Sequence, residues 1–158
     1  MHYIIDGYNL IFKDPLLAGY MKNQPETARR NLLQRLYTFK EYHKSRITVV
    51  FDGKIGIIPT EKSPAGIKVL FTKKGTADAR IIKIVENASK PSGMIVVSSD
   101  FKDIGIQVKD LGARCISSEE FLEQLCSFED EHKGAPEKPE NITPDEVDYW
   151  LKRFENRD

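Results

Sequence analysis

The sequence has few residues that bind transition metals or form covalent cross-links, with two cysteines and three histidines among 158 residues. Cys115 and Cys126 stand alone, without a CxxC pair or a cysteine–histidine cluster, which argues against a zinc site. We expect two reduced, half-buried thiols, although a count of two does not exclude a disulfide. Since 40% of the residues are hydrophobic, the chain can bury a core without such support.

Long apolar runs are also missing. The strongly apolar runs are as short as residues 94–97 (MIVV), whereas a membrane-spanning helix needs roughly 20 apolar residues. Near the N-terminus, Asp6 interrupts the apolar stretch and no basic segment precedes it, so we predict no signal peptide. These absences lead us to expect a cytoplasmic protein that does not bind a membrane.

The chain has no net charge, yet its charges are unevenly distributed. Residues 44–83 carry nine Lys/Arg and three Asp/Glu, a net charge of +6. Residues 129–158 carry five Lys/Arg and ten Asp/Glu, a net charge of −5. A basic segment in a neutral protein can bind a polyanion locally. The same pattern suits cations that only solvate loops, and charge alone does not decide between the two.

Short apolar runs alternate with helical patterns along the first 128 residues. Runs rich in β-branched residues predict strands over residues 3–5, 47–51, 67–71, 94–97 and 113–116. Apolar spacing and capping residues predict helices over residues 26–42, 76–88, 104–111 and 117–125. Because the strands are continuously apolar rather than alternating, we expect an α/β fold with a mostly parallel sheet of about five strands and helices on both faces.

The chain divides into a domain over residues 1–128 and a shorter C-terminal part. Residues 129–141 contain two prolines and no apolar periodicity, which predicts a linker. Residues 142–158 include a helix-capping pattern, TPDE, followed by four apolar residues at helical spacing: Val147, Trp150, Leu151 and Phe154. They predict an amphipathic helix, which must pack on the domain or on a partner because an isolated helix of this length is marginal in water.

Five aspartates are predicted to lie at one edge of the sheet. Asp6, Asp52 and Asp100 follow the first, second and fourth strands. Asp78 lies in the first turn of the helix after the third strand, and Asp103 comes one short turn after Asp100. Ligands of open parallel sheets bind beyond the carboxyl ends of the strands. Because clustered carboxylates repel one another, a hard divalent cation such as Mg²⁺ is the expected ligand.

Each aspartate also has an ordinary structural interpretation. Asp6-Gly7 and Asp52-Gly53 are common turn dipeptides. Asp78 can favour the helix dipole near an N-terminus, and Asp100 can belong to a loop or cap a helix. The metal hypothesis therefore depends on the joint placement of the aspartates, which follows from the predicted strands.

Several segments resemble, in the same order, the NYN domain of the PIN-like ribonucleases and its bacterial YacP-like branch. The resemblance spans residues 1–126. It is carried by IIDGYNLIF at residues 4–12, VVFDG at 49–53, KVLFT at 68–72, TADARI at 76–81 and VVSSD at 96–100. Each segment is short, and their common order makes the resemblance specific.

The resemblance implies a PIN-like three-layer sandwich and an endoribonuclease that hydrolyses RNA phosphodiester bonds with Mg²⁺ or Mn²⁺. It implies that Asp6, Asp78 and Asp100 are the catalytic metal ligands, with Asp52 as a further acidic member, and we add Asp103 to the metal set. We expect Asn9 to orient the loop after the first strand or to touch substrate. The other candidate substrate-binding residues are Lys73, Lys74, Arg80, Ser98 and Ser99.

The YacP-like branch also implies partners, namely RNA in the form of mRNA and the ribosome on which it is cut. Residues 129–158 are acidic, where related proteins look more basic, so ribosome binding stays open, as does the oligomeric state. An alternative function is a catalytically weak PIN-like module that binds RNA or a ribosomal partner. A haloacid dehalogenase needs a second aspartate where Tyr8 stands, and a response-regulator receiver needs an acidic pair that the sequence lacks.

Overall fold

The structure is a computed structural model that describes residues 1–53, 66–73 and 75–132. The predicted C-terminal helix over residues 142–158, most of the predicted linker and Lys74 lie outside the described residues.

The described part of the chain contains one parallel sheet of five strands in the order β3-β2-β1-β4-β5. The strands are β1 (His2–Asp6), β2 (Arg46–Phe51), β3 (Ile67–Phe71), β4 (Met94–Val97) and β5 (Arg114–Ile116). Strand β1 lies at the centre and pairs with both β2 and β4. The strand order reverses direction at β1, so the crevice above its carboxyl end is where ligands of such sheets bind.

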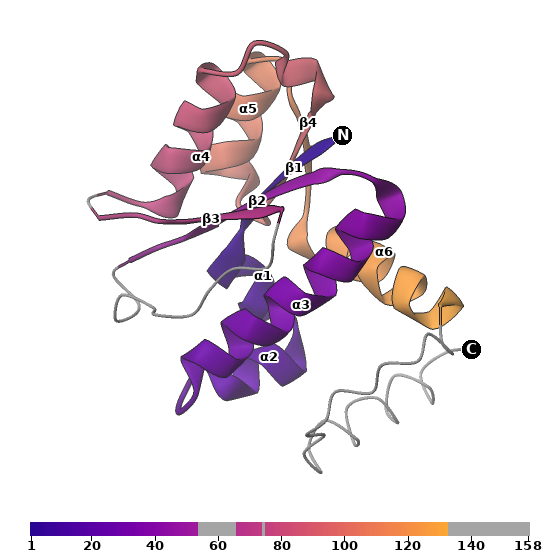
Figure 1. The fold of residues 1–158 in the computed structure, drawn as a ribbon. Helices are drawn as coiled ribbons and strands as arrows, with labels where there is room; N and C mark the ends of the chain where they lie inside the picture. Colours follow the sequence, from indigo (N-terminus) through magenta and orange to yellow (C-terminus); the bar gives the residue numbers. More distant parts are fainter. Residues whose placement is uncertain (54–65, 74, 133–158) are drawn as a thin grey trace.

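Helices cover both faces of the sheet (Figure 1). One layer contains α1 (Gly7–Lys13), α2 (Pro15–Tyr20), α3 (Pro25–His43) and α6 (Ser118–Glu131). The other contains α4 (Ala77–Glu86) and α5 (Ile106–Asp110). A 3₁₀ turn, η1 (Pro91–Gly93), lies between α4 and β4, and a π-helical turn, η2 (Phe101–Gly105), leads into α5. This arrangement confirms the predicted three-layer α/β sandwich.

Two hydrophobic cores lie between the sheet and its two helical layers, and β1 contributes side chains to both. Neighbouring side chains of a strand point to opposite faces. Ile5 therefore packs in the core that contains Leu32 of α3 and Phe121 of α6, whereas Ile4 packs in the core with Ile81 of α4. Both isoleucines are fully buried. The need to bury both faces explains why the strands read as continuous apolar runs.

The segment between Asp6 and Tyr20 forms two helices that the sequence did not lead us to predict. Asp6-Gly7 is not a turn, because Asp6 caps α1 and the helix begins at Gly7. Asp14 caps α2 by accepting from the backbone N–H groups of Leu16 and Leu17, and Pro15 occupies the first helical position. The Asp14-Pro15 pair was the available signal, since it is a common start of a helix.

Helix α6 is longer than predicted. The sequence suggested an end near Leu125, but the helix continues to Glu131, three residues into the stretch assigned to the linker. Phe128 explains the extension, because it continues the buried stripe of Phe121 and Leu125 and packs against Phe39 of α3. Burial of a large aromatic ring outweighs the polar composition around it.

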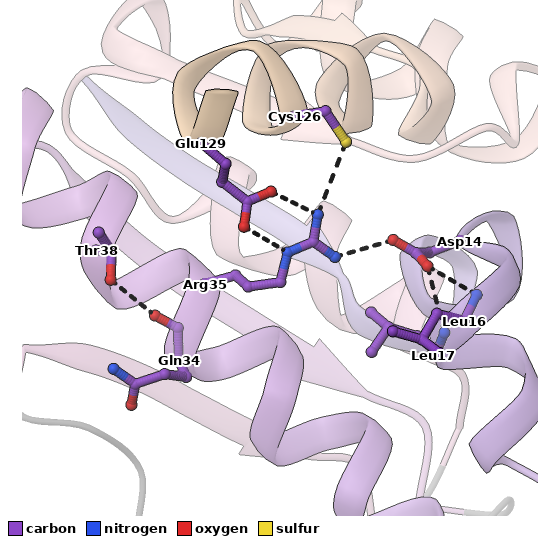
Figure 2. A network of polar contacts seen from close by, with 8 residues as sticks. All are labelled: Asp14, Leu16, Leu17, Gln34, Arg35, Thr38, Cys126 and Glu129. Carbon is purple, nitrogen blue, oxygen red and sulfur yellow. Dashed lines mark hydrogen bonds and ion pairs between the residues drawn. The ribbon is translucent and has the colours of Figure 1, made fainter. Parts of the chain in front are cut away.

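An arginine joins three helices of one layer (Figure 2). From α3, Arg35 donates two hydrogen bonds to the carboxylate of Glu129 on α6, at 2.8 and 3.0 Å, and one to Asp14 at 2.9 Å. Its guanidinium also lies 3.8 Å from the sulfur of Cys126. Since Asp14 is buried and caps α2, the network fixes α2 and α6 against α3.

Packing, rather than backbone conformation, requires a glycine at position 7. A Cβ atom there would lie 2.3 Å from Cε1 of Phe51, which is the last residue of β2 and fully buried. Phe51 also packs against Tyr8 of α1 and Phe71 of β3. Because β1 and β2 pair in parallel, their ends, with Asp6 and Asp52, lie side by side next to this contact.

Candidate active site

The structure brings the predicted aspartates to the carboxyl edge of the sheet. Asp6 ends β1, Asp52 follows β2 and Asp100 follows β4. These three strands are neighbours in the order β2-β1-β4, so their ends lie side by side. Asp78 reaches the same edge from the first turn of α4, which Thr76 caps by accepting from the N–H of Ala79.

Three carboxylates come close enough to share one cation. One oxygen each of Asp78, Asp100 and Asp103 lies within 4.8 Å of the other two. Asp100 is positioned by its own turn, because its backbone N–H donates to Ser98 Oγ and its carboxylate accepts from the N–H of Asp103. The tightest group therefore contains Asp103, whereas the sequence interpretation placed Asp6 with Asp78 and Asp100 at the centre.

Asp6 is the most buried of the five, with 9% of its surface exposed. Its pKa is raised from 3.8 to about 7, mainly by burial and also by the nearby charges of Asp78, Asp52 and Asp100, against a hydrogen bond from the Asn9 N–H that lowers it. Asp6 is therefore partly protonated at neutral pH when no cation is present.

The pKa of Asp78 is also raised above its ordinary value. Its pKa is raised by burial, by the charge of Asp100 and by a hydrogen bond with the Asp100 side chain, with smaller effects from Asp103 and Asp52. All five aspartates are thus electrostatically linked.

The donor set fits a hard divalent cation. Carboxylate oxygens are the ligands that Mg²⁺ and Mn²⁺ prefer, and Mg²⁺ commonly uses a few carboxylates and keeps several waters. Burial and mutual repulsion raise the pKa values of Asp6 and Asp78, so positive charge at the cluster would be stabilised. The acidic cluster can therefore bind a divalent metal.

Asn9, in the first turn of α1, joins this helix to two other elements of the edge. Its side-chain oxygen accepts from the Ser99 N–H at 3.1 Å and from the Ser118 hydroxyl at 2.6 Å. Ser118 begins α6, and its own N–H donates to Ser99 Oγ. These bonds hold the chain next to Asp100, and a contact of Asn9 with substrate stays a prediction.

Ser98 and Ser99, which follow β4, both form hydrogen bonds within the protein. Ser98 is fully buried, which corrects its assignment as a substrate contact, because its hydroxyl is not accessible from solvent. It instead accepts from the Asp100 N–H. The Ser99 hydroxyl donates to Glu119 at 2.8 Å, and Glu119 also lies 3.7 Å from the ammonium group of Lys13.

Lys73 and Arg80 are brought together beside α4. Both are exposed and line a groove of about 420 Å³ between β3 and α4. Arg80 lies two residues after Asp78, so it points to the opposite side of the helix from the carboxylates. Arg80 therefore lies on the groove side of α4, and the acidic cluster lies on the other side of the helix.

Sequence reasoning missed Ser118 and Glu119, which complete the network around Asn9 and Ser99. They follow β5, so they lie at the same carboxyl edge as the aspartates. The edge rule that singled out Asp100 would have included them. The sequence around them was interpreted only as the capped start of a helix, and Ser117 does cap that helix.

Fold and site together define a PIN-like α/β sandwich of the nuclease type, in which carboxylates gather at one edge of a parallel sheet. The chain belongs to the family of YacP-like NYN domains, which it matches over residues 3–156. It is 34% identical to the uncharacterized protein YacP of Bacillus subtilis (strain 168) over 104 residues, which are 63% of this chain and 61% of that protein. The match thus spans less than two thirds of the relative's length.

Solved structures support the same fold. The chain resembles the crystal structure of a point variant of Rae1 (YacP) from Bacillus subtilis with a TM-score of 0.69 and 28% identity, over 82% of this chain and 77% of that one. It resembles a second crystal structure of Rae1 (YacP), from the same organism, with a TM-score of 0.72 and 24% identity, over 98% of this chain and 81% of that one. Among the described residues, no helix is both long and apolar enough to cross a membrane.

Proposed function

We propose that this protein is a metal-dependent endoribonuclease that hydrolyses RNA phosphodiester bonds with Mg²⁺ or Mn²⁺. The observation that carries the proposal is the group of Asp78, Asp100 and Asp103, with one oxygen of each within 4.8 Å. Membership of the YacP-like NYN family supports nuclease chemistry, and the resemblance to PIN-like ribonucleases supports RNA as the substrate.

Asp78, Asp100 and Asp103 would hold the cation, with Asp6 and Asp52 next to it. Bound there, the metal supplies a water of lowered pKa and neutralises charge that develops on the phosphodiester. A cation bound there would lower the raised pKa values of Asp6 and Asp78, because positive charge favours the ionised carboxylates. Asn9 holds the turn that carries Asp100 through the Ser99 N–H, which keeps the carboxylates in place.

Lys73 and Arg80 would bind the RNA backbone beside the carboxylates. Contacts to phosphate position a strand without reading its sequence. We propose mRNA as the natural substrate and the ribosome as a partner, on the strength of the YacP-like family. We also propose that the protein acts on RNA in the cytoplasm.

The test is cleavage of an end-labelled single-stranded RNA by the full chain, with Mn²⁺, with Mg²⁺ and with EDTA. Internal cleavage that requires the metal and is lost in Asp78→Asn supports the proposal. Asp110→Asn is the matched control, because Asp110 is an exposed aspartate at the end of α5. Equal cleavage by the Asp78 variant, or cleavage in EDTA, would overturn the mechanism.

A binding module without a metal site is distinguished by thermal unfolding. A cation that binds only the folded protein stabilises it by about 2.7 kcal/mol at a hundred times its dissociation constant. We expect Mn²⁺ to raise the melting temperature of the unmodified protein and of Asp110→Asn, and to have a smaller effect on Asp78→Asn. A Mn²⁺ response without RNA cleavage would favour a catalytically weak metal-binding module.

A further inference from the structure

The groove beside α4 has a chemistry that the carboxylate cluster lacks. Its lining consists of Leu70, Phe71, Thr72 and Lys73 from β3 and the chain after it, and Thr76, Ala79, Arg80 and Lys83 from α4. Its volume of about 420 Å³ lies within the range of about 300–1,000 Å³ typical of ligand sites. Three of the lining residues are cations and none is acidic.

The cations of the groove form a stripe on one face of α4. Thr76, Arg80 and Lys83 are spaced at i, i+4 and i+7, so their side chains lie on the same side of the helix. Lys73 approaches from the end of β3. In the described part of the chain, no carboxylate forms an ion pair with any of the three cations. Their charge is therefore available to an anionic ligand.

The groove and the carboxylate cluster meet at the N-terminal turn of α4. Thr76 and Ala79 line the groove, and Asp78 between them belongs to the cluster. Two residues along a helix correspond to about 200° of rotation, so Asp78 and Arg80 project to opposite sides of the same turn. A strand that bends around the start of α4 can contact both sites.

We propose that the groove between β3 and α4 binds the phosphate backbone of the RNA strand next to the bond that is cut, with Lys83 as a contact that extends the strand's path away from the carboxylates. This proposal rests on the proposed nuclease function. Arg80 and Lys83 are three residues apart, which is a rise of about 4.5 Å along the helix, so they contact separate phosphates rather than one. The half-buried side chain of Leu70, which packs on the α4 side of the sheet, offers an apolar surface at the groove.

The proposal is tested by RNA binding without cleavage. The full chain is titrated with a labelled single-stranded RNA oligonucleotide in EDTA over a range of salt concentrations. Arg80→Ala and Lys83→Ala should each weaken binding at least about threefold and reduce the slope of log K against log salt by about 0.7, which is the effect of one lost phosphate contact to a single strand. Lys22→Ala is the matched control, because Lys22 is an exposed lysine in the turn after α2.

The cleavage assay separates this proposal from the proposed function. In Mn²⁺, Lys83→Ala should raise KM and leave kcat unchanged, because the residue holds the strand and does not touch the reacting atoms. If the protein cleaves RNA and Lys83→Ala matches Lys22→Ala in salt slope and KM, the groove proposal fails while the nuclease stands. If no cleavage occurs but the slope falls by the expected amount, the groove binds RNA and the nuclease proposal fails.

Discussion

Carboxylate oxygens of Asp78 and Asp100 lie within 4.8 Å of each other, although Asp78 is on α4 and Asp100 is on the turn after β4. Burial raises the pKa of Asp78, and the proximity of Asp100 raises it further, which favours the protonated form of Asp78. A divalent cation would favour the ionised carboxylates instead, which links metal binding to proton release.

Asp78→Asn should reduce RNA cleavage by at least about a hundredfold, the size typical of losing one electrostatic stabiliser of a transition state. Without metal, the free energy of unfolding should stay equal or increase slightly, because one repelling charge has been removed from the cluster. Single-turnover cleavage and urea unfolding in EDTA measure the two effects. Full activity would remove Asp78 from the catalytic residues.

The metal-free protein should become less stable as pH rises from about 4 to about 7. Asp6 has a pKa of about 7 when folded and near 3.8 when unfolded, so in this window the folded state binds the extra proton. Its stabilising effect is complete below pH 3.8 and is lost as pH rises through 7.

The pH effect is isolated by Asp6→Asn, since asparagine also caps helices well. Urea unfolding in EDTA at a series of pH values should show that stability falls by about 2–4 kcal/mol more in the unmodified protein than in the variant. Parallel curves for the two proteins would contradict the raised pKa of Asp6.

Asn9→Ala should leave the Ser99 N–H and the Ser118 hydroxyl without their acceptor. The expected loss of stability is about 1–3 kcal/mol. We also expect kcat to fall more than KM rises, because the turn that carries Asp100 loses its support. Asn9→Asp retains an acceptor at the same place and should keep more stability than the alanine variant; equal loss in both would show that the acceptor is not what matters.

Arg35→Leu should lower the free energy of unfolding by about 3–5 kcal/mol, because it leaves the carboxylates of Asp14 and Glu129 without the guanidinium that they contact. Arg30→Leu is the matched control on the exposed side of the same helix and should change stability by less than about 0.5 kcal/mol. Chemical denaturation compares them. A similar small effect for both would mean that the network in Figure 2 contributes little.

Gly7→Ala should destabilise the protein by about 1–3 kcal/mol, because its methyl group would meet the ring of Phe51 at 2.3 Å. Gly19→Ala provides the opposite case. Gly19 lies in α2, and no atom of the described residues lies within 4 Å of the place that its methyl group would take, so alanine should stabilise by about 0.5–1 kcal/mol. Thermal unfolding of the pair tests whether packing or backbone freedom explains each glycine.

The sequence by itself determined the layers of the fold and the edge that carries the site. Continuous apolar strands, separated by helical patterns, require a parallel sheet with both faces covered. Once the strands are parallel, Asp6, Asp52 and Asp100 must lie at the same edge, because Asp6 ends a strand, Asp52 directly follows one and Asp100 lies in the turn after one. Local patterns suffice for this part, since hydrophobic periodicity and strand direction do not depend on distant contacts.

Only the tertiary structure decided which carboxylates lie together and which helices form. Asp103 joins Asp78 and Asp100 because the π-helical turn folds back beside the start of α4, a contact between segments distant in the sequence. Helices α1 and α2 are too short to show a clear apolar period, and they are stabilised by packing against α3 and the sheet. Distances between side chains on different elements depend on long-range packing, which no local pattern in the chain encodes.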